Sequence, residues 1–186
     1  MTIQHNVITD PDIHEPKGAA AAASGQVYVA NGSGSGTWKD KDKWLGVYTG
    51  FDSATPAYAH STTTSNTVLN NTWVSGANDG FTIETVPNAR LKYTGTETIT
   101  AFIQVSLATQ QASGSNKVVE WAVYKNGTEI TGSRVLRTLS TSTWGSITMS
   151  SVVSLATNDY LELFTKADGA CTVNFASIQL SVQGHS

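Results

Sequence analysis

Charged side chains are scarce in this chain. Asp, Glu, Lys and Arg make up 13% of its 186 residues, about half the share that is usual for globular domains. The formal net charge is −3, so the basic surface that nucleic-acid binding requires is missing. The hydrophobic fraction is nevertheless 39%. We therefore expect a folded protein with a polar, largely uncharged surface and no nucleic-acid partner.

Cysteine and long apolar runs are scarce as well. The one cysteine, Cys171, excludes an internal disulfide, and no cationic neighbour in sequence suggests a reactive thiol. No stretch reaches the ~18 apolar residues of a membrane-spanning helix. The N-terminus MTIQHNVITD lacks the basic and apolar regions of a signal peptide. We expect maturation in the cytoplasm of the host cell that makes the protein, and no membrane partner.

Helical periodicity is also missing, because no pattern of period 3.6 runs longer than two turns. From Leu45 onward the chain consists of short runs rich in β-branched and aromatic residues, separated by turn signals. Asn126-Gly127, between two such runs, predicts a two-residue hairpin turn. About ten such runs over residues 45–186 predict an all-β domain, a β-sandwich of jelly-roll type.

Alternating side chains predict which face of each strand meets the core. Trp121 alternates with Val119 and Val123, and Leu161 and Leu163 oppose Tyr160, Glu162 and Phe164. In TITAFIQVSLA one face carries only apolar residues, which are Ile99, Ala101, Ile103, Val105 and Leu107. We expect these apolar faces to lie inside the sandwich.

The first 44 residues differ from the rest. Pro11 and Pro16 favour extended backbone before them, and the alanine run 19–23 is shorter than the ~12 residues of an isolated helix. QVYVA predicts one short strand, and the NGSGSG that follows predicts a flexible hinge. Since a lone strand is not stable in water, we expect residues 1–44 to form an extended arm that becomes ordered on a partner.

The order of strands after residue 45 resembles the trimeric jelly roll of the tumour necrosis factor (TNF) and complement C1q superfamily. DGFTIETVPNARLKYTGTETITAFIQVSLA, AVYKNGTEI, DYLELFTK and CTVNFASIQLSVQ follow one another as similar phrases do in that family, although Ser177 stands where the family's last strand has Gly. The resemblance implies a homotrimer. It also implies that aromatic residues form the three-fold interface, for which the candidates are Phe102, Tyr160 and Phe164.

The arm resembles an N-terminal phrase of tailed-bacteriophage virion proteins that serve as head fibres or capsid decoration. The phrase is DPDIHEPKGAAAAASGQVYVANGSGSGTW. The resemblance implies a structural protein on the capsid exterior of a virion, bound through its arm to the major capsid protein. The residues that it makes candidates for capsid anchoring are Asp10, Pro11, Asp12, Ile13, His14, Glu15, Pro16, Lys17, Val27, Tyr28, Val29 and Trp38.

No motif predicts catalysis, a metal site or a cofactor. The acidic residues and histidine of DPDIHE are not held by helix or hairpin geometry. Glu120 and Glu162 lie at outward positions of their strands rather than as an acid–base pair. The glycine spacing of GSGSG fits neither a nucleophile elbow nor a phosphate loop. We expect His5, His60 and His185 to be solvated, and we expect no enzyme activity.

Other readings stay open. Trp73 and Trp144 lie beside the loops NNTWVSG and STSTWGS, where they are candidate contacts for host-surface glycans. The protein would then be the receptor-binding tip of a tail fibre. A monomeric carbohydrate-binding module on a linker is a third reading, and a hydrolase is a distant fourth.

Overall fold

The computed structural model describes residues 22–24, 26–33, 36–40, 45–52, 58–70 and 74–185. Of Asp40 and residues 48–52 it describes only the backbone. The chain divides into two compact units, Met1–Asp42 and Lys43–Ser186. Within these described ranges the regular elements are all strands, and no helix there is long and apolar enough to cross a membrane.

The strands have the following bounds in chain order: β1 Gln26–Ala30, β2 Gly36–Asp40, β3 Leu45–Asp52, β4 Tyr58–Thr62, β5 Thr67–Val68, β6 Val74–Ser75, β7 Phe81–Glu84, β8 Arg90–Tyr93, β9 Ile99–Gln111, β10 Lys117–Lys125, β11 Thr128–Glu129, β12 Val135–Leu139, β13 Gly145–Leu155, β14 Tyr160–Ala167 and β15 Cys171–His185.

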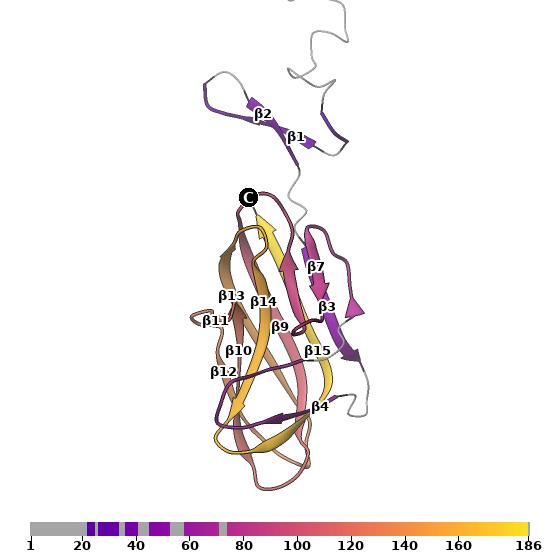
Figure 1. Cartoon of the computed structure of the whole chain (residues 1–186), viewed down its shortest axis with the longest axis vertical. Coiled ribbons are helices and arrows are strands. Elements are labelled where there is room, and N and C mark those ends of the chain that lie inside the picture. Colours follow the sequence, from indigo (N-terminus) through magenta and orange to yellow (C-terminus); the bar gives the residue numbers. More distant parts are fainter. Residues whose placement is uncertain are drawn as a thin grey trace, which may run out of the picture. The chain divides into compact units, whose positions relative to one another are not determined.

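Strands β3 to β15 form two antiparallel sheets that face each other (Figure 1). The seven-stranded sheet has the order β11-β10-β14-β8-β7, with β12 also paired to β10 and β5 to β14. The six-stranded sheet has the order β13-β9-β15-β3-β6, with β4 also paired to β15. The chain passes from the six-stranded to the seven-stranded sheet between β9 and β10 and again between β13 and β14, and it returns between β14 and β15. This confirms the expected all-β jelly-roll sandwich.

The core lies between the two sheets and contains the apolar faces that the alternation predicted. All five apolar residues of TITAFIQVSLA are buried. Trp121, Val119 and Val123 of β10 are buried opposite them, together with Leu161 and Leu163 of β14. Because successive strand residues point to opposite sides, this core also determines which residues form the two outer faces.

The predicted turn between β10 and β11 is present. Asn126 and Gly127 have φ angles of 51° and 76°, the positive values that such a turn requires. Asn126 Nδ2 also donates a hydrogen bond to Asp159 Oδ1 at 2.6 Å, and Lys125 forms an ion pair with the same carboxylate at 3.0 Å. These two contacts with Asp159 hold the turn next to the start of β14.

The N-terminal unit contains a hairpin, so the prediction of a lone strand was wrong. β1 pairs antiparallel with β2, and Tyr28 lies directly opposite Trp38. Their rings meet edge-on, with centroids 5.4 Å apart. The NGSGSG segment, predicted as a hinge, connects the two strands. A segment rich in Gly and Ser suits either a flexible hinge or the connection of a hairpin. The pairing of β1 with GTWKD shows that this one connects the strands of a hairpin.

Candidate interaction surfaces

The six-stranded sheet has an outer face built from uncharged strands. None of the residues of β9, β13 or β15 is Asp, Glu, Lys or Arg. Their outward positions carry mostly Ser, Thr and Gln, for example Thr148 beside Ser106 and Ser106 beside Gln179. Such side chains cost far less to remove from water than charged ones do. This face is therefore suited to burial against another molecule.

A row of exposed apolar residues crosses the uncharged face. The register places Val152 beside Phe102, Phe102 beside Gln183 and Gln183 beside Leu45. Val152 is 62% exposed and Phe102 is 47% exposed, and Leu45 is exposed as well. The row spans four neighbouring strands and concentrates accessible apolar surface in one band of the face.

The outer face of the seven-stranded sheet is charged. Glu120 forms ion pairs with Arg134 at 2.8 Å and with Lys166 at 3.1 Å. Glu84 forms ion pairs with Arg90 at 2.5 Å and with Lys92 at 3.2 Å. Each exposed pair of this kind contributes only about 0–1 kcal/mol. Burying the charged outer face against another molecule therefore costs more free energy of desolvation than burying the uncharged one.

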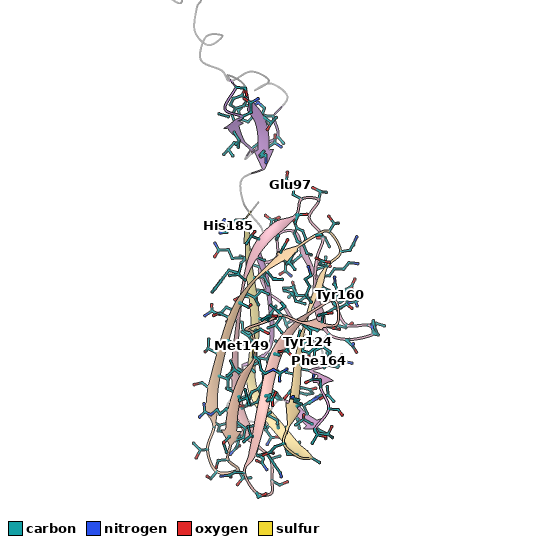
Figure 2. All side chains as sticks on the ribbon, turned by 90° about the vertical axis from the view of Figure 1, so that its left-hand side faces the viewer. Glu97, Tyr124, Met149, Tyr160, Phe164 and His185 are labelled. Carbon is teal, nitrogen blue, oxygen red and sulfur yellow. The ribbon has the colours of Figure 1, made fainter. Side chains whose placement is uncertain are left out.

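Aromatic side chains lie among these charges. The rings of Tyr124 and Phe164 have centroids 4.1 Å apart, and the Arg90 guanidinium lies 4.3 Å from the centroid of Tyr160. Figure 2 shows Tyr124, Phe164 and Tyr160 close together on one side of the sandwich. Asn66 Nδ2 donates to the Tyr124 hydroxyl at 2.7 Å. Burial, followed by the nearby Glu129 charge, raises the pKa of Tyr124, which keeps this phenol protonated.

The structure does not bring the three predicted interface aromatics together. Phe102 lies on β9, in the apolar row of the six-stranded sheet, whereas Tyr160 and Phe164 lie on β14 of the other sheet. The outer faces of the two sheets point away from each other across the core. One flat contact surface therefore contains Phe102 or the β14 pair, but not all three.

The predicted anchoring residues divide between described and undescribed parts of the chain. Val27, Tyr28, Val29 and Trp38 lie on the β1–β2 hairpin, and the two valines are exposed on the face opposite the Tyr28–Trp38 contact. The other candidates, residues 10–17, lie outside the described residues. The hairpin thus presents apolar side chains on both faces.

One of the two predicted glycan contacts lies among the described residues. Trp144 is half-buried at the end of the loop between β12 and β13, where Gln110 Nε2 donates to the Thr141 carbonyl at 2.7 Å. Trp73 lies outside the described residues.

His60 lies in a hydrogen-bonded network, so the expectation that it is solvated was wrong. Tyr58 Oη lies 2.8 Å from Nδ1, and Nε2 lies 2.9 Å from Thr67 Oγ1. Thr67 in turn donates to the Thr165 carbonyl at 3.1 Å. These contacts connect β4 of one sheet to β5 and β14 of the other and suit a neutral imidazole. Burial lowers the pKa of His60.

Glu120 and Glu162, the carboxylates considered from the sequence, lie apart along one sheet. Glu120 lies opposite Lys166, four residues along β14 from Glu162, so their backbone positions are separated by roughly 13 Å along the strand. Glycosidase pairs are about 5–9.5 Å apart. Burial, and then the Asp168 charge, raises the pKa of Cys171, the opposite of thiol activation. Within the described ranges no three His, Cys, Asp or Glu side chains are grouped to bind a metal ion.

Two features of these surfaces were not found from the sequence. The absence of charge from β9, β13 and β15 is visible in the sequence, but not the fact that these strands are neighbours. Asn66, Asn88 and Arg90 reach the aromatic cluster from loops and a short strand, and no local pattern marks them.

Comparison with known proteins supports the fold. No family model matches the chain, and no curated protein matches it in sequence. Among solved structures it is similar to the TNF Eiger of S. frugiperda, at 7% identity over 77% of this chain and 92% of that one, with a TM-score of 0.53. Murine APRIL at pH 8.5 and at pH 5.0 matches at 12% and 14% identity, over 75% of this chain and 98% of each of those, with TM-scores of 0.43. The match to Eiger shows the fold alone, a β-sandwich with a TNF-like jelly-roll arrangement.

Proposed function

We propose that this chain is a structural virion protein, a homotrimer that decorates the capsid of a tailed bacteriophage and is attached to it through the N-terminal unit. It acts by binding and not by catalysis. The observation that carries the proposal is the uncharged outer face of β9, β13 and β15 with its row of exposed apolar residues.

The trimer is supported by the chemistry of that face. Two further copies of the chain cover it without burying an unpaired charge, because its three long strands contain no Asp, Glu, Lys or Arg. Val152, Phe102 and Leu45 supply the apolar contact, and the surrounding Ser and Gln side chains supply hydrogen bonds. Of the three aromatics predicted for the interface, Phe102 belongs to this contact.

The capsid attachment is supported by the two-unit organisation and by the resemblance of residues 10–38 to phage virion proteins. A two-stranded hairpin is only marginally stable in water. The β1–β2 hairpin exposes Val27 and Val29 on the face opposite Tyr28 and Trp38. Covering these valines on a capsid surface would stabilise the hairpin, and three copies per trimer would raise the effective concentration of each.

The test is co-sedimentation with purified particles of a phage that carries the protein, after the bound protein has been stripped. The full-length chain binds, and the chain without residues 1–42 keeps a three-chain mass in light scattering but no longer binds. The double variant Val27→Asp/Val29→Asp weakens binding by at least tenfold, whereas Leu136→Ser, at an exposed position of β12 outside the hairpin and the trimer contact, serves as the matched control. Retained binding after deletion of residues 1–42 would refute the attachment, and a single-chain mass would refute the trimer.

A further inference from the structure

Strand β13 lies at one edge of the six-stranded sheet. It pairs with β9 over its whole length, from Gly145 to Leu155, and no other described strand pairs with it. In an antiparallel strand the N–H and C=O of one residue point to the same side, and successive residues alternate between the two sides. One alternate set of its backbone groups therefore bonds to β9, and the other set points away from the sheet.

Two side chains from the other sheet show which set points away. Arg137 Nη1 of β12 donates to the Ser146 carbonyl, and Lys125 Nζ at the end of β10 donates to the Ser154 carbonyl at 2.8 Å. The even-numbered residues between these two carbonyls direct their backbone groups the same way. They are all exposed, and they are Thr148, Ser150 and Val152.

A free edge of this kind is prone to pair with another chain, and proteins usually protect it. The common protections are a short strand, proline, charged side chains on the strand and a β-bulge. β13 is 11 residues long and contains neither proline nor a charged residue, and its register with β9 runs without a shift. Its uncharged composition also favours strand pairing. Protection of this edge therefore has to come from outside the strand.

Both cationic side chains are held at the ends of the edge. Lys125 also forms an ion pair with Asp159 at 3.0 Å, which keeps its ammonium beside β13. The Arg137 guanidinium lies over Gly145, where an added Cβ atom would come within 2.5 Å of Cζ, so the missing side chain at this position gives it room. A strand that added along the whole edge would have to displace both cations from the carbonyls to which they donate.

A second copy of β13 is a partner that matches the edge, because two uncharged strands pair without burying a charge of their own. In the antiparallel register centred on Ser150, each end of one edge lies opposite the other end of its partner. Arg137 of one copy then meets Lys125 of the second copy at both ends. Like charges directly opposite each other destabilise a strand pair, so this register is unfavourable while both cations are present.

We propose that Lys125 and Arg137 block the free edge of β13 from antiparallel pairing with β13 of a second copy of this chain. In the wild type the uncovered stretch from Thr148 to Val152 is too short for a stable two-stranded ladder. Without the two cations the whole edge is available. This contact differs from the proposed trimer contact, because the backbone groups of an edge lie in the plane of the sheet and the trimer contact covers its outer face.

Amide hydrogen exchange of the full-length protein, labelled with ¹⁵N, tests whether the edge is uncovered. We expect the amides of Ser150 and Val152 to exchange at least tenfold faster than those of Met149 and Ser151, which bond to β9. Equal protection of the two sets would mean that another segment already covers the edge, and the proposal would fail.

Light scattering of the full-length protein tests the role of the two cations. Lys125→Ala/Arg137→Ala raises the solution mass to at least twice that of the wild type at high protein concentration, and it slows amide exchange at Ser150. The matched control Lys92→Ala/Lys166→Ala removes two cations from the same sheet and leaves the mass unchanged. Adding Ser150→Pro to the first variant restores the wild-type mass, because proline has no N–H for the new ladder and β9 does not use this N–H.

An unchanged mass in Lys125→Ala/Arg137→Ala, or an equal rise in the control, overturns the proposal. A rise that Ser150→Pro does not reverse also overturns it, since the association then does not use this edge. If the double variant does not fold, Arg137→Ala decides: it breaks no ion pair of the described residues and opens one end of the edge. A raised mass supports the proposal and an unchanged mass refutes it. Each comparison is with the wild-type mass, so the outcome does not depend on the trimer.

Discussion

Phe102 is the residue on which the proposed trimer contact depends most directly. It is 47% exposed, and an aromatic side chain buries about 150–250 Å² when it is fully covered. Roughly half of that area is therefore left to be covered by another copy. At ~25 cal/mol per Å², this corresponds to about 2–3 kcal/mol per protomer. Phe102→Ser removes most of this contribution and resembles the Ser and Thr residues that already occupy the same face.

The effect on assembly is large because each trimer contains the residue three times. A loss of about 6–9 kcal/mol per trimer lowers the assembly constant by a factor on the order of 10⁴ to 10⁶. Light scattering after gel filtration, repeated over a hundredfold range of protein concentration, measures the mass directly. We expect the wild type to keep a three-chain mass and the variant to approach a one-chain mass on dilution.

A matched control separates the contact from the general loss of exposed apolar surface. Leu136 is 55% exposed on β12, and it lies opposite Glu120 of β10 on the charged face of the other sheet. Leu136→Ser leaves the mass unchanged. If Phe102→Ser stays trimeric at every concentration at which the wild type does, or if Leu136→Ser dissociates equally, the uncharged face is not the trimer interface.

Two further predictions concern stability. Ile103→Ala, at a fully buried position of β9, lowers the free energy of unfolding by about 2–5 kcal/mol, which a urea titration measures; a loss below 1 kcal/mol would mean that the core is not closed around this residue. Burial lowers the pKa of His60 in the folded protein, so the stability linked to its neutral form is fully present above its ordinary value of about 6.5 and is lost as the pH falls through the folded-state pKa. The melting temperature of the wild type therefore falls more steeply between pH 8 and pH 5 than that of His60→Asn, and parallel curves would contradict the buried network.

Local patterns in the sequence predicted those parts of the fold that depend on neighbouring residues. The alternation in TITAFIQVSLA placed Ile99 and Ile103 in the core because side chains of any strand alternate with a period of two. The Asn126-Gly127 turn was predicted because few residues adopt positive φ without strain. Both predictions involve interactions within a few residues of the chain.

Predictions that depended on a distant or ambiguous partner were wrong. The β1 strand was predicted to be unpaired because GTWKD carries little strand signal of its own. Its partner comes after a glycine-rich segment, and Tyr28 and Trp38 lie opposite each other in the pair. His60 was assigned to a solvated loop because its surroundings are rich in Ser and Thr. It is half-buried because Thr67 hydrogen-bonds to its ring, and Thr67 in turn donates to the carbonyl of Thr165, 98 residues further along the chain.

The sequence by itself determined that this is an all-β chain with little charge, and which side of each long strand is apolar. Only the tertiary structure decided that β9, β13 and β15 are neighbours, so that three uncharged strands form one continuous face, and that Phe102 and Val152 meet on it. It also decided that Glu162, at an outward position of β14, lies opposite Tyr124 of β10 and accepts a hydrogen bond from Asn88 in a loop. The physical reason is that the direction of a side chain is set by local backbone geometry, whereas the neighbours of a strand are set by hydrogen bonds between segments far apart in the chain.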